Sequence, residues 1–258
     1  MTKRSNAELK KMARTTLSGK WGTAIGITIL YMLIVFGLSM LSTPFAMQVN
    51  NGYFIALGLV ISFIISLIAL IFAAGQILFF MNMCRGREYR IGDLVSAFKL
   101  HPDRFIVAGL LLMLLGIVLM LPVFALAFLN VLGIPSVAVL LIMIVWLVIG
   151  TILMVMISLR FALYTMLLLD NPDMGAIESL RVSSQYMRGN KGRYFYMELS
   201  FIGWILLGAC SCYVGLLWVI PYMSATQVYF YLDVIGELDT QPTQESAPDA
   251  GIHMSSFE

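Results

Sequence analysis

The chain has 258 residues, of which 60% are hydrophobic and only 12% are charged, with a formal net charge of +2. Soluble domains carry about 25% charged residues, so this composition excludes an ordinary soluble protein. Residues 21–84, 105–159 and 199–232 contain no charged side chain at all. Each of these blocks can hold two membrane-spanning helices of about 20 residues, or nearly so, which predicts an all-α, polytopic membrane helix bundle.

Six transmembrane helices, arranged as three hairpins, are the simplest division of these blocks. The predicted spans are residues 22–43, 54–82, 105–129, 137–159, 194–209 and 213–232. Every Lys and Arg lies in segments 1–20, 85–104 and 160–198, which the positive-inside rule places in the cytoplasm. The even number of spans then leaves both termini on the cytoplasmic side.

The last two spans depend on a fold-back within the apolar run 194–232. As one helix this run would be about 58 Å long, nearly twice the thickness of the membrane core. Gly208, Ser211 and Gly215 mark the expected turn. The alternative is one tilted span and an interfacial helix, which would place the C-terminus outside.

The first 20 residues have the pattern of a cytoplasmic amphipathic helix. Ser5 and Glu8 have the spacing of a capping box, and the apolar residues that follow recur with helical spacing. Lys10, Lys11 and Arg14 occupy the other face. We expect this helix to lie on the membrane with its basic face toward anionic inner-leaflet lipids, and to brace the bundle; lipid sensing and partner docking are the alternatives.

Two further cytoplasmic helices precede the later spans. One is predicted to begin at Asn171-Pro172, with Asn as the cap, and to end at Gly189, while a shorter one covers residues 93–99. At the start of the former, Asp170 and Asp173 are expected to complement the helix dipole. The chain therefore has three units of one plan, in which a cytoplasmic interfacial helix precedes a transmembrane hairpin.

The predicted domains are residues 1–20, the six-helix domain 21–232 and an acidic cytoplasmic tail 233–258. The tail holds six acidic residues and no basic one, and its polar composition predicts disorder. The whole sequence has only two histidines, His101 and His253, and the Cys210-x-Cys212 pair has no nearby His. We therefore expect no catalytic residues, no metal site and no cofactor.

A set of residues from both ends of the chain resembles a known bacterial membrane family, the domain of unknown function 975. These residues are Gly19, Trp21, Gly22, Ser183, Gly189, Lys191, Ser200, Phe201, Gly203, Trp204, Pro221, Tyr222 and Tyr231. That family is similar in layout to the membrane portions of some glycerophosphodiester phosphodiesterases, whose separate catalytic domain is missing here. The resemblance implies a bacterial plasma-membrane protein of about six helices and implies no activity.

Two ionisable residues lie at or within predicted spans. Arg160 comes at the end of the fourth apolar run, and Glu198 lies one turn into the fifth span. Because an isolated charge is costly at depth and both lie near the cytoplasmic side, an Arg160–Glu198 pair is one hypothesis. Independent extension of each side chain to the interface is the other.

The sequence therefore predicts a non-enzymatic accessory or scaffold protein of the bacterial plasma membrane that acts on lipids or on a membrane partner. The expected partners are the bilayer, its anionic inner-leaflet lipids and a further membrane protein, and no nucleic acid. The alternative is a transporter or exporter of a small amphipathic or apolar substrate. Ion-coupled transport usually uses acidic groups near the membrane midplane, for which only Glu198 is a candidate.

Overall fold

The computed structural model describes residues 3–46, 52–132 and 136–240 of the chain, and these form helices joined by short turns. The long helices are α1 (Asn6–Leu17), α2 (Trp21–Met40), α4 (Gly52–Cys84), α6 (Pro102–Val131), α7 (Val137–Arg160), α9 (Ala176–Tyr186), α10 (Lys191–Cys210) and α11 (Leu216–Ile235). The short helices are α3 (Thr43–Ala46), α5 (Asp93–Ser96), α8 (Tyr164–Asp170) and α12 (Glu237–Thr240). The all-α prediction is confirmed.

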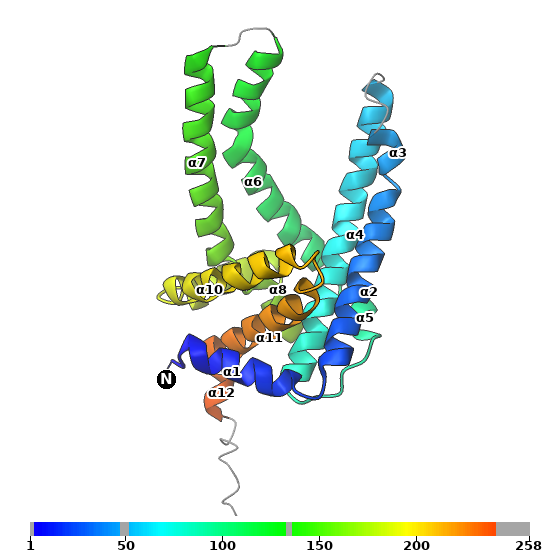
Figure 1. The fold of residues 1–258 in the computed structure, drawn as a ribbon, viewed down its shortest axis with the longest axis vertical. Helices are drawn as coiled ribbons and strands as arrows, with labels where there is room; N and C mark the ends of the chain where they lie inside the picture. Colours follow the sequence, from blue (N-terminus) through cyan, green and yellow to red (C-terminus); the bar gives the residue numbers. More distant parts are fainter. Residues whose placement is uncertain (1–2, 47–51, 133–135, 241–258) are drawn as a thin grey trace, which may run out of the picture.

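Two long hairpins, α2–α4 and α6–α7, rise from a common base and diverge from each other (Figure 1). Within the described residues, four helical stretches are long and apolar enough to cross a membrane, at Trp21–Phe45, Gly52–Cys84, Pro102–Leu129 and Val137–Asp170. The first three agree closely with the predicted spans, and the fourth begins at Val137 as predicted but continues past residue 159 to Asp170. Lipid offers no water to the backbone N–H and C=O groups, so an apolar segment that crosses it satisfies their hydrogen bonds by forming a helix.

The base is formed by α1, α8, α9, α10, α11 and α12 together with the lower ends of α2, α4 and α6. Figure 1 shows α10, α11 and α1 below one another, all lying across the direction of the hairpins. The core lies here, because Phe79, Phe105, Phe201 and Phe230 have at most 1% of their surface exposed. In the most apolar stretches of α4 and α6, by contrast, only 11% and 0% of the residues are buried.

The predicted fifth and sixth spans correspond to α10 and α11, which do not belong to the four spans found in the described residues. The expected fold-back does occur between them. A Cβ atom on Gly215 would lie 2.8 Å from the Cα atom of Gly208, so the two helices approach closely at their turn. Because this hairpin lies across the others, the six-span arrangement is not confirmed.

The cytoplasmic helices follow the predicted order with shifted boundaries. The capping box between Ser5 and Glu8 is present at the start of α1. The helix expected from Asn171 begins instead at Ala176, because Asn171 ends α8 and its side chain donates to the carbonyl of Leu167 at 3.0 Å. The acidic tail also starts later than residue 233, since α11 and α12 continue to Thr240; the rest of the tail lies outside the described residues.

Candidate functional site

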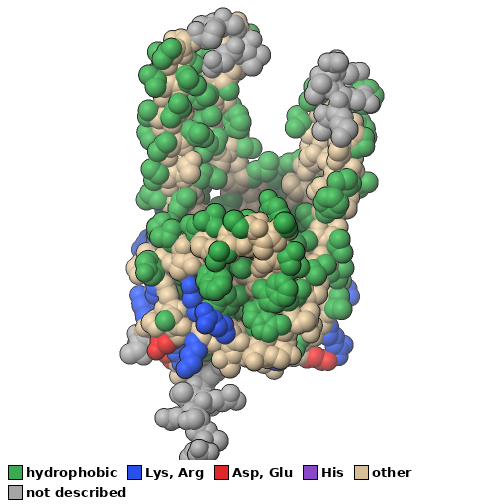
Figure 2. Space-filling view, in the orientation of Figure 1, with side chains coloured by type: hydrophobic (Ala, Val, Ile, Leu, Met, Phe, Trp, Pro, Cys, Tyr) green, Lys and Arg blue, Asp and Glu red, His purple; other side chains and the backbone are tan. Residues whose placement is uncertain are grey.

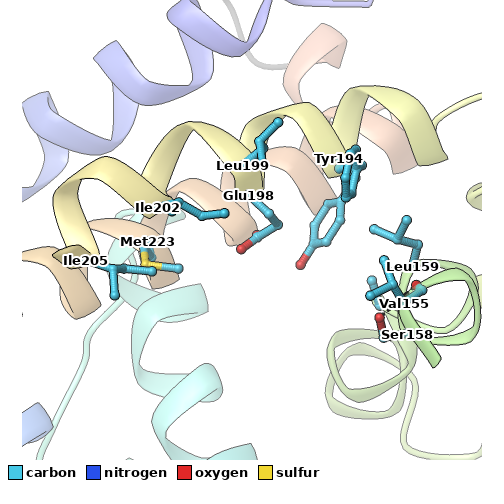
Figure 3. Close-up of a pocket in the computed structure, with 11 residues that line it drawn as sticks. Val155, Ser158, Leu159, Tyr194, Glu198, Leu199, Ile202, Ile205 and Met223 are labelled. Atoms are coloured by element: carbon cyan, nitrogen blue, oxygen red, sulfur yellow. Dashed lines mark hydrogen bonds between the residues drawn. The ribbon is translucent and has the colours of Figure 1, made fainter. Parts of the chain in front are cut away.

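A pocket of about 440 Å³ lies between the lower end of α7 and one side of α10. Its lining is apolar except for Ser158, Tyr194 and Glu198. In Figure 3 the side chains of Tyr194 and Glu198 both point into the space beside α7. The remaining lining residues are Val155, Leu159, Ala162, Phe195, Leu199, Ile202, Ile205 and Met223. This volume and chemistry suit an apolar molecule that carries a few hydrogen-bonding groups.

The helical repeat explains how α10 builds its side of the pocket. Tyr194 and Glu198 are four residues apart, so they lie on one face, and Leu199, Ile202 and Ile205 continue that face toward the turn. The Glu198 Oε1 atom accepts a hydrogen bond from Gln227 Nε2 of α11 at 3.0 Å. Gln227 thereby helps to hold the Glu198 carboxyl group in position.

Burial raises the pKa of the Glu198 carboxyl, while hydrogen bonds from Gln227 and Tyr194 and the charge of Lys10 oppose this shift. A buried carboxyl of this kind keeps its proton to a higher pH than an exposed glutamate does. It can therefore donate a hydrogen bond when protonated and accept one when ionised.

Arg160 and Glu198 do not form the ion pair that was one of the two hypotheses for them. Arg160 Nε donates to Ser184 Oγ of α9 at 2.8 Å, and no ion pair joins Arg160 to Glu198 among the described residues. The reason is that the two side chains point in different directions. Ser158 and Leu159 line the pocket, and because each residue advances about 100° around the helix axis, the Arg160 side chain points away from the pocket toward α9.

Three of the family-like residues meet α1 on the other side of α10. Lys10 donates to the hydroxyl of Ser200, and its ammonium nitrogen lies 4.2 Å from the ring centre of Phe201. Arg14 Nε donates to the hydroxyl of Tyr222 on α11 at 3.0 Å. The basic face of α1 is therefore directed partly at protein, which corrects the expectation that all of it meets lipid.

Other family-like residues hold the base together. Ser183 is fully buried, accepts a hydrogen bond from the backbone N–H of Leu163 at 3.2 Å and donates to the carbonyl of Arg160 at 3.3 Å, which joins α9 to the turn after α7. Gly19 and Gly189 have φ angles of 75° and 76°, a conformation that glycine adopts without strain. The rest are placed along their helices: Trp21 and Gly22 open α2, Lys191 opens α10, Gly203 and Trp204 are exposed on α10, and Pro221 is buried within α11.

A charged network that the sequence reasoning missed joins four elements of the base. Arg85 at the end of α4 contacts Asp170 through its Nη1 and Nη2 atoms, at 2.5 and 2.7 Å, and Glu237 of α12 through Nε and Nη2, at 2.8 and 2.6 Å. Tyr231 donates to Asp170 Oδ2 at 2.6 Å. Asp170 was expected to cap a helix, and nothing local in the sequence indicates its distant partner Arg85.

Metal-binding chemistry is not indicated in the part of the chain that the structure describes. It contains no group of three or more His, Cys, Asp or Glu residues that could hold a metal ion. Cys84, Cys210 and Cys212 are all free. Of the two described pockets, the one beside Glu198 has the larger volume and is lined by an ionisable side chain.

The four long apolar helices indicate an integral membrane protein, and the described residues have an all-helical fold. A profile described as "Protein of unknown function (DUF975)" matches residues 1–237, so the chain belongs to this family. No curated protein and no solved structure matches the chain. The likeness to glycerophosphodiester phosphodiesterase membrane portions stays a prediction.

Proposed function

We propose that this protein is a non-enzymatic accessory protein of the bacterial plasma membrane that holds a lipid at the inner leaflet. The observation that carries the proposal is the pocket between α7 and α10, which combines an apolar lining with a carboxyl group and two hydroxyl groups. A lipid chain would occupy the apolar part. A hydroxyl or amino group of the same molecule would meet Glu198 and Tyr194, since a phosphate would be repelled by an ionised carboxylate.

The proposal includes a topology of four spans, with α10 and α11 embedded at the cytoplasmic surface and both termini in the cytoplasm. Its main support is the contact of α1 with α11. Arg14 bonds to Tyr222, which lies near the middle of the predicted sixth span, and Glu8, Lys11 and Arg14 are exposed. If α11 crossed the bilayer, these charges would be carried into hydrocarbon, at about 2.5–3.5 kcal/mol for each Arg or Lys.

Two native cysteines at the α10–α11 turn allow this topology to be tested. Cys210 and Cys212 are exposed. A membrane-impermeant maleimide added outside intact cells is expected to leave both unlabelled, whereas six spans would place them at the outer surface and give labelling. Ser42→Cys, at the distal end of α2, is the positive control and should react. Labelling of Cys210 and Cys212 as fast as this control would overturn the four-span topology.

Lipid binding in the pocket is tested by filling it. Ile202→Trp places a large side chain in the lining, and Leu206→Trp makes the same change on an exposed part of α10 outside the lining. Native mass spectrometry of the detergent-purified protein is expected to show about one fewer bound lipid per chain for Ile202→Trp and no loss for Leu206→Trp. Equal lipid retention by both variants and the unsubstituted protein would contradict the proposal.

Transport is the alternative, and Glu198 distinguishes it. Coupled transport through the pocket would require this carboxyl to exchange protons or ions, so Glu198→Gln would abolish substrate accumulation in vesicles. A lipid-holding accessory shows no such accumulation before or after the substitution. Because Gln keeps the size of Glu and an oxygen that can accept the hydrogen bond from Gln227, the fold of the base is expected to persist.

A further inference from the structure

Two cations of α1 lie against the α10–α11 hairpin on the side away from the pocket. Lys10 and Arg14 are four residues apart, so they lie on one face of α1. The Lys10 ammonium lies over the ring of Phe201, and the Arg14 guanidinium carbon lies 5.3 Å from the ring centre of Tyr222. The fold therefore presents two adjacent positive charges at the edge of this hairpin.

Within the described ranges, neither cation forms an ion pair with an acidic side chain. The ion pairs between described residues involve Arg85, Arg90 and Arg193, and none includes Lys10 or Arg14. Burial and then the charge of Arg14 lower the pKa of Lys10, and the opposing effect of Glu198 is the weakest of the three. The two like charges repel each other, and an anion between them would relieve this repulsion.

An exposed apolar surface continues from these cations along α10. Ser200, Gly203 and Leu207 follow one another at helical spacing, and Trp204 lies beside them. Trp204 is 51% exposed and Leu207 is 65% exposed. Figure 2 shows hydrophobic side chains gathered on this front face of the base, with Lys and Arg side chains directly below them. Tryptophan beside cations at an apolar boundary is typical of the membrane interface.

We infer that α1 and α10 together form a binding site for an anionic inner-leaflet phospholipid, with Lys10 and Arg14 contacting its phosphate and its chains lying over Trp204 and Leu207. The site is separate from the pocket at Glu198, which faces α7. The inference rests on the proposed topology, because the four-span arrangement places α1 at the inner surface. The adjoining apolar surface favours a phospholipid over a free phosphate ion.

The test compares two variants that remove the same charge from the same segment. Lys10→Gln with Arg14→Gln removes the inferred site, whereas Lys3→Gln with Lys11→Gln removes two exposed cations outside it. Both are measured by native mass spectrometry against phosphatidylglycerol and phosphatidylcholine in mixed micelles. We expect the first variant to bind phosphatidylglycerol about thirtyfold more weakly, and the second to change this affinity by less than about threefold.

Other outcomes overturn the inference. Equal losses in both variants would mean that only the general surface charge attracts the lipid. An unchanged preference for phosphatidylglycerol with a lower unfolding temperature would mean that Lys10 and Arg14 act only in packing. Displacement of the lipid by millimolar inorganic phosphate would mean that the apolar surface contributes nothing. If Ile202→Trp still removes a lipid in these cases, the proposed function at the Glu198 pocket is supported and only the Lys10–Arg14 site is refuted.

Discussion

The two hairpins and the base obey different rules of packing. In the apolar stretches of α6 and α7 only 0% and 6% of the residues are fully buried, so nearly every side chain keeps part of its surface exposed. In the base, Ala225, Phe230 and Leu232 of α11 are completely buried. The hairpins therefore depend on lipid as their solvent, whereas the base folds around a core of its own as a soluble domain does.

The polar interactions of the hairpins also differ from those of the base. A hydrogen bond at 3.0 Å from Trp146 Nε1 to the carbonyl of Leu119 joins α6 to α7. The Arg85, Asp170 and Glu237 network lies at the base, below the spans. The same amino-acid change should therefore lower the stability of the protein by very different amounts in the hairpins and in the base.

The largest difference is expected from paired phenylalanine substitutions. Phe230→Ala removes a fully buried ring from the base and should lower the free energy of unfolding by about 3–5 kcal/mol, because a cavity replaces it. Phe124→Ala removes a ring that is 61% exposed on α6 and should change this free energy by about 0.5 kcal/mol or less. Thermal unfolding in detergent measures both, and similar losses would show that the hairpins have a packed core as well.

Two arginines provide the second comparison. Arg85→Gln removes the cation that Asp170 and Glu237 share, and because the Arg85 side chain is only 6% exposed the loss should be about 3–5 kcal/mol of stability. Arg90→Gln breaks an ion pair with Glu88 whose side chains are 72% and 74% exposed. This change should cost about 1 kcal/mol or less, since water screens the pair. Chemical unfolding in mixed micelles would reveal whether Arg85 is as important as its contacts indicate.

A smaller effect is expected from two helical glycines. A Cβ atom on Gly75 would lie 2.1 Å from the carbonyl oxygen of Leu94, so Gly75→Ala must push α5 away from α4 and should cost about 1–3 kcal/mol. A Cβ atom on Gly37 would meet nothing within 4 Å. Gly37→Ala should therefore be neutral or slightly stabilising, and an equal loss of unfolding temperature in both variants would contradict this.

The hairpins could be predicted from the sequence, because in lipid the composition of a segment largely decides whether it spans. The same reasoning failed to separate α10 and α11 from the four spans, although both helices are long enough to span and are less apolar than those four. Their polar residues, such as Glu198 and Gln227, are the sequence signal that could have been used. The contact between Arg14 and Tyr222, which are far apart in the sequence, could not have been found in this way. The fold-back at Gly208 and Gly215 could be predicted because it depends on local glycines.

The candidate site was predictable only in part. Glu198 stood out because a carboxyl in an apolar run is costly, and Tyr194 could have been found from its spacing of four residues. Gln227 could not, since it comes from the next helix. The hypothesis that Arg160 pairs with Glu198 was wrong, because equal depth along two helices does not determine which way their side chains point.

The helix at the centre of the base, α11, comes after the other long helices in the described part of the chain, so it is synthesised after them. α11 contacts α1, α2, α4, α10 and α12. A nascent chain that ends before Leu216 already contains all four apolar stretches and the residues through which α4 packs against α6. It lacks the helix against which α1, α2 and α10 pack. We therefore expect a chain terminated at this point to keep the contact between its two hairpins but to leave α1 and α10 without their main packing surface.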